Sequence, residues 1–325
     1  PLLTILADAK DGKFDAESFD GLKREYFRRL KEITELTCRV VNEMERHLAE
    51  INPALILSLG VGCSMRRGED AFSTGMDYNH TSICEVAFAS TVDSLVAIRE
   101  TVYERHELSL AEFGAILAAG WRGREPLRLR LSRMPNKWGC GDAGTDRLGR
   151  ELLATFTGFF VGRPNARGGV YTCYGINSRG YLETGRRTSA TPDGRKANEE
   201  LSKNMAPAIG GDANGVTGVL RSWGASVDPA FFPCGSVLDM MIHASSVGGE
   251  KGLCSLRAIC EHYFDSGGCA LNLNIQSVAE LKDAQAHPEK YENLQVRVAG
   301  WNIRWNDIPK SEQDGFIRRL EAMPQ

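Results

Sequence analysis

The residue type best suited to metal or redox chemistry in this chain is cysteine, which occurs at positions 38, 63, 84, 140, 173, 234, 254, 260 and 269. No two of these residues form a C-x-x-C pair, which disfavours a zinc ribbon, a thioredoxin-like site and the usual iron–sulfur motifs. Cys254, Cys260, His262 and Cys269 do lie close together in the sequence. We interpret them as buried thiols in a reducing cytoplasm, so we predict no metal site and no disulfide scaffold.

A second feature is Gly300, which separates two strand-like runs near the end of the chain. Before it, apolar residues fall at even positions, namely Leu294, Val296 and Val298. After it, they fall at odd positions, namely Trp301, Ile303 and Trp305. A period of two changes face only at a bulge, a bend or a turn. The sequence therefore predicts that Gly300 lies at the tip of a bend, where a glycine tolerates positive φ.

The elements that must hold these residues are mostly helices. The clearest is predicted over residues 16–51, where apolar residues recur every three or four positions until Pro53 ends the pattern. We predict further helices over 87–104, 146–157 and 250–265, from Ser109 and Ser277 as capping-box residues, and from about Pro309. The run CALNLNIQ, residues 269–276, alternates as a strand. Strands that alternate with helices indicate an α/β fold.

Two segments give few periodic signals. Residues 54–82 are glycine-rich and irregular, and residues 162–200 combine many Gly, Arg and Asn residues. We expect the second segment to line something functional, because irregular stretches inside a compact chain often do.

The composition is that of an ordinary globular protein. The 325 residues are 42% hydrophobic and 25% charged, with a net charge of −3, which gives no electrostatic reason to expect binding to nucleic acid or to an anionic membrane. No apolar run reaches the 18 or so residues of a membrane span, and no signal peptide is recognisable.

The segment RVAGWNIRWNDIPKSEQDGFIRR resembles the C-terminal signature of glycyl radical enzymes, R-V-x-G-[YFW]-x-x-x-[FW] followed by a helix. The matching residues are Arg297, Val298, Gly300, Trp301, Trp305, Gln313, Ile317 and Arg319. The segment TSATPDGRKANEELSKNMAP, residues 188–207, is similar to a second family motif, with Asn198 where glycine is usual. GVTGVLRSW and CGSVLDMMIH also match, so the resemblance covers nearly the whole chain and points to the pyruvate formate-lyase and diol dehydratase superfamily.

The resemblance implies that Gly300 loses a hydrogen atom from Cα and stores the resulting radical. This post-translational radical is the only cofactor that it implies. We expect Gly300 at the tip of a finger loop in the centre of a packed barrel, away from oxygen and water. The resemblance assigns support of this loop to Arg297, Val298, Trp301, Trp305, Gln313 and Arg319. We expect both tryptophans to pack in the core and keep the loop dry, and Arg319 either to anchor the interior or to form a salt bridge on its helix face.

In the family, the stored radical passes to a cysteine in a G-C-x-E loop, and this chain contains no such loop. We therefore expect the chain to be the C-terminal portion of a longer enzyme, which agrees with its start at Pro1. Cys63, Cys140 and Cys234 are spare candidates for the thiyl radical, although a buried or incidental cysteine explains each of them more simply.

The implied fold is the C-terminal part of a ten-stranded α/β barrel, made of two half-barrels with helices outside. Residues 1–185 would belong to the barrel domain and residues 186–325 to a glycine radical domain continuous with the same barrel. The expected function is a radical lyase or dehydratase acting on a small molecule. Alternatives are an acyltransferase of the pyruvate formate-lyase type, a non-catalytic radical carrier and an inactive paralogue. Implied partners are an S-adenosylmethionine-dependent radical activase, the N-terminal remainder and a second copy in a homodimer.

Overall fold

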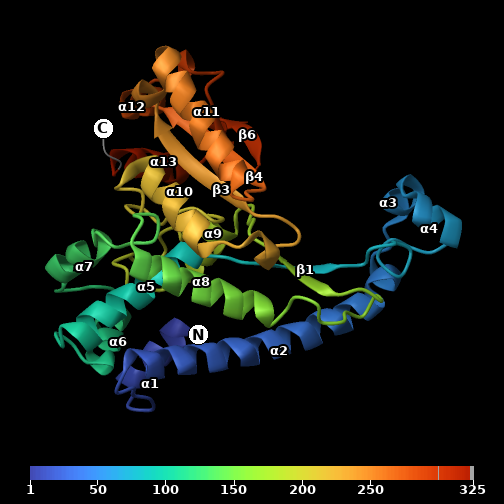
Figure 1. The fold of residues 1–325 in the computed structure, drawn as a ribbon, viewed down its shortest axis with the longest axis horizontal. Helices are drawn as coiled ribbons and strands as arrows, with labels where there is room; N and C mark the ends of the chain where they lie inside the picture. The colour runs from blue at the N-terminus through green and yellow to red at the C-terminus, as the bar shows by residue number, and fades with distance from the viewer. Residues whose placement is uncertain (299, 323–325) are drawn as a thin grey trace.

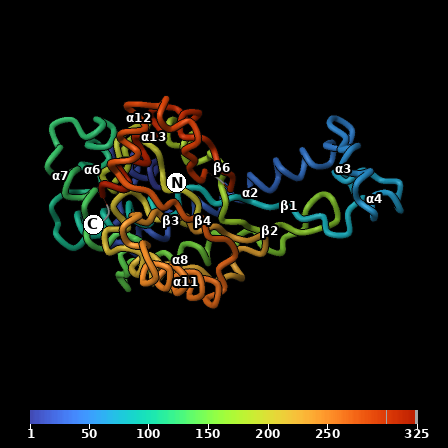
Figure 2. Tube along the Cα trace, turned by 90° about the horizontal axis from the view of Figure 1, so that it is seen from above, coloured from blue at the N-terminus to red at the C-terminus, as the bar shows by residue number. Residues whose placement is uncertain are grey.

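The computed structural model describes residues 1–298 and 300–322. Figure 1 shows a body from which an arm projects, built on the long helix α2 (Phe19–Ile51) and ending in α3 (Leu55–Gly60) and α4 (Gly62–Arg67). Figure 2, turned by 90°, shows the same arm standing away from the body. The helix predicted over 16–51 is therefore confirmed as α2. It begins where the Ser18 hydroxyl accepts a hydrogen bond from the Gly21 N–H.

The remaining α-helices surround the strands of the body. They are α1 (Leu2–Lys10), α5 (Phe88–Ile98), α6 (Leu110–Ala118), α7 (Glu125–Ser132), α8 (Ala143–Gly158), α9 (Gly180–Arg187), α10 (Gly215–Ser226), α11 (Gly249–Asp265), α12 (Val278–Ala286) and α13 (Lys310–Glu321). Shorter helical turns are η1 (Arg99–Glu104), η2 (Pro229–Phe231), η3 (Ala244–Val247), η4 (Pro288–Lys290) and η5 (Trp305–Asp307). Among the described residues, no helix is long and apolar enough to cross a membrane.

The strands form three two-stranded ladders. β1 (Thr81–Cys84) pairs in parallel with β2 (Tyr171–Tyr174), and β3 (Val237–His243) pairs in parallel with β4 (Ala270–Gln276). One parallel bridge between Gly175 and Ser236 links the end of β2 to the start of β3. β5 (Gln295–Val298) and β6 (Trp301–Arg304) form an antiparallel hairpin. The α/β prediction is confirmed, whereas the described residues contain three separate ladders and no closed ten-stranded barrel.

One hydrophobic cluster forms the core of the body, and another joins the hairpin to the body. The larger cluster runs from α1 to α11 and has Trp138, Trp223 and Tyr171 among its fully buried side chains. The smaller cluster lies beneath the hairpin and consists of Met241, Leu281, Ala284, Val296, Val298, Trp305, Ile308, Ile317 and Leu320. The hairpin thus packs on α12, α13 and β3, which places it at the α11–α13 end of the molecule (Figure 1).

Most of the predicted helices occur, with shifted ends. The helix predicted over 87–104 is α5 followed by the π-helical turn η1, and the Ser109–Glu112 capping box of α6 is present in full. The segments that lacked periodicity are more ordered than the sequence indicates, because 54–82 contains α3, α4 and the start of β1, and 162–200 contains β2 and α9. These elements are only four to eight residues long, too short for a periodic pattern to show.

We predict that Gly114→Ala destabilises the protein by about 1–3 kcal/mol, because a Cβ at Gly114 in α6 would lie 2.2 Å from the Leu6 carbonyl oxygen of α1. The control is Gly158→Ala at the exposed end of α8, where a Cβ meets no atom within 4 Å. Helix propensity then favours alanine by up to ~1 kcal/mol. Urea unfolding measures both variants, and equal stabilities would contradict the tight α1–α6 contact.

Candidate functional site

The strand β4 buries its polar face. Asn272, Asn274 and Gln276 are 7%, 5% and 7% exposed, whereas Ile275 on the opposite face is 37% exposed. Buried amides require hydrogen-bond partners, so this face must meet another polar surface. The sequence shows the alternation of β4 but not which of its faces lies inside, so sequence reasoning missed these three amides as residues of the site.

Two of the β4 amides, Asn274 and Gln276, bind backbone groups of β5. Asn274 Oδ1 accepts from the Arg297 N–H at 2.8 Å, and Asn274 Nδ2 donates to the Arg297 carbonyl at 3.2 Å. Gln276 Nε2 donates to the Gln295 carbonyl at 3.0 Å. Side chains of β4 therefore bind the main chain of β5, where backbone hydrogen bonds would join the two strands in a continuous sheet.

A charged network lies behind these amides. Asp239 of β3 accepts hydrogen bonds from Lys203 Nζ at 2.7 Å and from Asn272 Nδ2 at 3.1 Å. Asn272 Oδ1 in turn accepts from Arg297 Nε at 3.4 Å. The Arg297 side chain reaches across the hairpin to Asn302 Oδ1 at 3.3 Å. The network thus connects the parallel strands of the body to both strands of the hairpin.

Gly300 follows directly at the tip of the hairpin. Val298 pairs with Trp301, so Gly300 lies in the connection between β5 and β6, and it has a φ of 93°. The predicted bend is confirmed, and only glycine adopts this φ without strain. Gly300 is exposed, and a Cβ built on it would meet no atom within 4 Å. The described residues therefore do not by themselves provide the shelter that we expected around this position.

The two tryptophans of the motif behave differently. Trp305 is fully buried, and its ring lies edge-on to Phe316 of α13 with centroids 6.0 Å apart. Trp301 is 50% exposed, so the expectation that it packs in the core is wrong for the described residues. Trp301 belongs to β6, which pairs with no strand other than β5 among the described residues.

Gln313 and Arg319 of α13 contact different parts of the chain. Gln313 Nε2 donates to the Trp305 carbonyl at 2.9 Å, which holds the turn that follows β6. Arg319 donates to the Pro207 carbonyl at 3.1 Å and to Glu200 Oε1 at 3.3 Å, and its side chain is 14% exposed. Arg319 therefore combines an interior anchor with an ion pair. It lines a small cavity of about 40 Å³ together with Asp239 and Asn274.

The segment expected to line something functional does border a cavity. A cavity of about 340 Å³ is lined by residues 193–196 and 199–202, by Lys137, and by residues of α7 and α13, and by no residue of the hairpin. Arg195 donates to the carbonyls of Gly185, Ser189 and Glu199, which ties the TPDGR turn together. The hydrogen bonds from the Arg195 side chain to these neighbouring carbonyls therefore give the turn a structural explanation.

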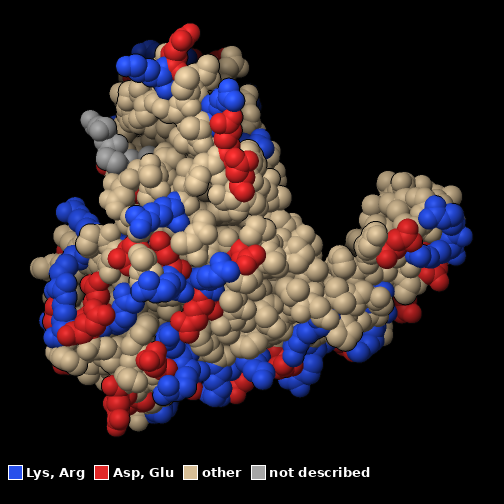
Figure 3. Space-filling model, viewed as in Figure 1, with Lys and Arg blue, Asp and Glu red and all other residues tan. Residues whose placement is uncertain are grey.

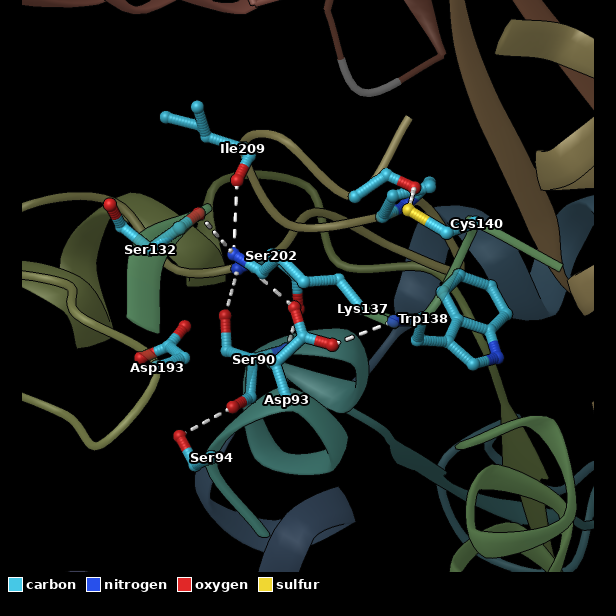
Figure 4. A network of polar contacts seen from close by, with 12 residues as sticks. Ser90, Asp93, Ser94, Ser132, Lys137, Trp138, Cys140, Asp193, Ser202 and Ile209 are labelled. Atoms are coloured by element: carbon cyan, nitrogen blue, oxygen red, sulfur yellow. Dashed lines mark hydrogen bonds and ion pairs between the residues drawn. The ribbon is translucent and has the colours of Figure 1, made fainter. Parts of the chain in front are cut away.

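The spare cysteine candidates lie in unrelated surroundings. Cys63 is buried in α4 at the end of the arm. Cys140 donates to the Gly211 carbonyl at 3.3 Å, and burial raises the pKa of its thiol (Figure 4). Cys234 is exposed, with Sγ 3.2 Å from both Ser82 Oγ and Thr172 Oγ1. Among the described residues, no hydrogen bond joins any of the three to the hairpin.

Figure 4 also shows a buried ion pair beside Cys140. Lys137 Nζ lies 3.5 Å from Asp93 Oδ2 and donates to the Ile209 carbonyl at 3.1 Å, while Asp93 Oδ1 accepts from the Trp138 N–H at 2.8 Å. Burial raises the pKa of Asp93 to about 7, although Lys137 opposes this shift. The pair fixes the loop between α7 and α8 against α5, which is a structural role.

The cysteine cluster of α11 requires a correction. Cys254 and Cys269 are exposed and Cys260 is partly exposed, so these three thiols are not the buried ones that we predicted. Cys254 and Cys260 belong to α11, and Cys269 directly precedes β4. Across the described part of the chain, no group of three or more His, Cys, Asp or Glu residues is placed to hold a metal ion.

Residues 4–182 match the family model described as pyruvate formate lyase-like, and residues 201–306 match the model described as glycine radical. The first match covers more than half of the chain, and the chain belongs to the pyruvate formate lyase-like family. The hairpin with Gly300 and the β4 amides all fall within the glycine radical match.

Three relatives illustrate this membership. The chain is 28% identical over 305 residues to trans-4-hydroxy-L-proline dehydratase of Clostridioides difficile, covering 94% of this chain and 38% of the relative. A solved structure described for 1,2-propanediol dehydration in Roseburia inulinivorans superposes with a TM-score of 0.89 at 28% identity, over 98% of this chain and 42% of that one. A glycyl radical enzyme from Archaeoglobus fulgidus superposes with a TM-score of 0.86 at 29% identity, with the same coverage. The chain thus spans about two fifths of the length of these relatives.

Glu85 is a buried carboxyl group close to the end of β1. Glu85, directly after β1, is 7% exposed, and neither carboxylate oxygen has a hydrogen-bond partner among the described residues. Burial raises the pKa of this carboxyl to about 8. The folded state therefore keeps a proton that the unfolded state has already lost.

We predict that the free energy of unfolding falls as pH rises from 6 to 9, by about 2–3 kcal/mol from Glu85, because this stability is lost as pH passes through the raised pKa. Because glutamine cannot ionise, the free energy of unfolding of Glu85→Gln should fall by about 2–3 kcal/mol less between pH 6 and 9. The exposed Glu289→Gln is the matched control and should follow the unmodified protein. Urea unfolding at both pH values measures the difference, and parallel behaviour of Glu85→Gln and the unmodified protein would contradict the buried, protonated carboxyl.

Proposed function

We propose that Gly300 stores an unpaired electron and that this chain is the radical-bearing part of a glycyl radical enzyme of the lyase or dehydratase type. The observation that carries the proposal is the position of Gly300 at the tip of a hairpin inside the glycine radical match. Loss of one hydrogen atom from Cα leaves a planar radical, stabilised by the adjoining amide nitrogen and carbonyl. Glycine suits this site because no side chain opposes planarity.

The proposed cycle transfers hydrogen atoms and balances in each step. The Gly300 radical takes the hydrogen atom of a cysteine S–H, which restores glycine and leaves a thiyl radical. The thiyl radical then takes a hydrogen atom from a C–H bond of a small-molecule substrate and becomes a thiol again. The product radical takes a hydrogen atom back from this thiol, and the thiyl radical that results takes one from the Gly300 Cα, which restores the stored radical. We place that cysteine in a G-C-x-E loop on polypeptide outside these 325 residues, since Cys63, Cys140 and Cys234 make their contacts elsewhere.

We further propose that this additional polypeptide completes the ten-stranded barrel and covers Gly300 and Trp301. The arm supports this, because α2 exposes an apolar stripe whose residues are between 48% and 64% exposed. The stripe consists of Ile33, Leu36, Val40 and Met44. Figure 3 shows that the hollow between arm and body is almost free of charged side chains, whereas Lys, Arg, Asp and Glu follow the outer side of the arm. An apolar, unpartnered surface of this kind is typical of a face that another part of a protein covers.

The proposed partners follow from the same chemistry. An activase that uses S-adenosylmethionine and an iron–sulfur cluster would remove the first hydrogen atom from Gly300, and two copies of the enzyme would form a homodimer. A cytoplasmic setting suits nine cysteines that are all free among the described residues. The division into a barrel segment, residues 1–185, and a radical domain, residues 186–325, is part of the proposal.

The reaction proposed first is dehydration or a related C–X cleavage, because two of the three relatives described above are named for dehydration. An acyltransferase of the pyruvate formate-lyase type is the second candidate, since the family model over residues 4–182 is shared. That same match disfavours a bare radical carrier, which has no use for an extensive barrel segment. Turnover assays on diols, hydroxylated amino acids and 2-oxo acids distinguish the first two.

We predict that anaerobic activation of the full polypeptide gives a doublet in electron paramagnetic resonance, because one hydrogen remains on the radical carbon. Gly300→Ala should reduce this doublet below detection. Gly249→Ala is the matched control, because Gly249 also has positive φ, of 66°, and open space around its Cβ position. A doublet that persists in Gly300→Ala would refute the assignment, provided that thermal unfolding shows both variants to be folded.

We also predict that air cuts the activated protein at position 300, since oxygen adds to a carbon radical and the backbone then breaks there. Mass spectrometry should find two fragments that meet at Gly300, in an amount equal to the radical measured before exposure. Protein that was never activated is the control and should remain intact. Only intact chain after exposure of a doublet-bearing sample would contradict the position of the radical.

A further inference from the structure

Among the described residues, the hairpin that carries Gly300 has no backbone ladder to the other strands. β5 and β6 form a sheet of their own, separate from β3 and β4. A two-stranded hairpin is marginally stable by itself, so its place on the body depends on side-chain contacts. The contacts to the neighbouring strand come from the buried amides of β4.

We propose that Asn274 and Gln276 are positioning residues for the radical: they fix the register of β5 and thereby the place of Gly300. The inference rests on the proposed function of Gly300. Neither residue touches the reacting atoms, and both act through the main chain of β5.

Asn274 defines the register because it contacts both polar groups of a single residue. Its Oδ1 accepts from the Arg297 N–H at 2.8 Å while its Nδ2 donates to the Arg297 carbonyl at 3.2 Å. A shift of β5 by one residue would turn Val296 and Val298, each 1% exposed, away from the core. It would also move Gly300 by one residue length, about 3.3 Å. The two hydrogen bonds of Asn274 and the burial of Val296 and Val298 therefore favour the same register of β5.

Gln276 gives a second contact, two residues further along β4 and two residues back along β5. Its Nε2 donates to the Gln295 carbonyl at 3.0 Å, while its Oε1 is buried without a hydrogen-bond partner among the described residues. Replacing this side chain with methionine removes the contact to β5 and at the same time removes an unpaired buried oxygen. Gln276→Met is thus expected to fold as well as the unmodified protein, which makes it the safer of two variants.

The test uses the full polypeptide with three variants: Asn274→Leu, Gln276→Met and the control Ile275→Ala. Ile275 lies between the two amides on the other face of β4 and is 37% exposed. Hydrogen–deuterium exchange of residues 295–304 is measured before activation, and the yield and lifetime of the glycyl radical doublet are measured after it. Thermal unfolding reports whether each variant is folded.

We expect exchange of the hairpin amides to rise about tenfold in Asn274→Leu and about fivefold in Gln276→Met, with Ile275→Ala unchanged. The doublet should shorten in lifetime in the same order while retaining its splitting, because the spin stays on the same carbon in a less fixed hairpin. A merely structural residue would instead change the unfolding temperature and leave the exchange of the hairpin like that of the rest of the folded chain.

Two outcomes separate this inference from the proposed function. If the unmodified protein gives the doublet and folded Gln276→Met shows unchanged exchange and radical lifetime, the positioning role is overturned while the radical assignment stands. If the unmodified protein gives no doublet, the proposed function fails, and with it the inference that Asn274 and Gln276 position a radical, whatever the exchange rates are.

Discussion

The site depends on the contact between the amide side chains of β4 and the main chain of β5. This contact puts polar residues on the inner face of a strand, where Asn274 and Gln276 bind the main chain of β5 and Asn272 binds Asp239 and the Arg297 side chain. It also keeps the hairpin distinct from the parallel ladders, so that Gly300 stands out from the body at the end of a short, separately held element. Trp305, Gln313 and the small hydrophobic cluster fasten the base of that element.

The tip and the base of the hairpin meet opposite requirements. At the base, Trp305 is 0% exposed, whereas at the tip Gly300 is exposed and Trp301 is 50% exposed among the described residues. A stored radical needs the tip to be dry. The uncharged hollow beside the arm and the apolar stripe of α2 indicate where further polypeptide would lie. Exposure of Gly300 and its proposed chemistry are therefore compatible only if that polypeptide is present.

Sequence reasoning succeeded where the pattern is local. The 33 residues of α2, the Ser109 capping box and the change of phase at Gly300 each have their cause within a few positions. It failed where the cause lies elsewhere in the chain. The buried face of β4 is decided by β5, twenty residues later, and the exposure of Trp301 by what lies beyond the hairpin. The short strands β1 and β2 carry too few residues for a period, and the sequence does not show that the thiols in and beside α11 are exposed.

The most direct test of the account is the spectrum of activated protein produced with glycine deuterated at Cα. The account places the spin on a glycine α-carbon whose single remaining hydrogen splits the signal, so deuteration should collapse the two lines into one. Protein made with ordinary glycine should keep both lines under the same conditions. Two lines of unchanged spacing in the deuterated sample would place the spin on another atom and contradict the account.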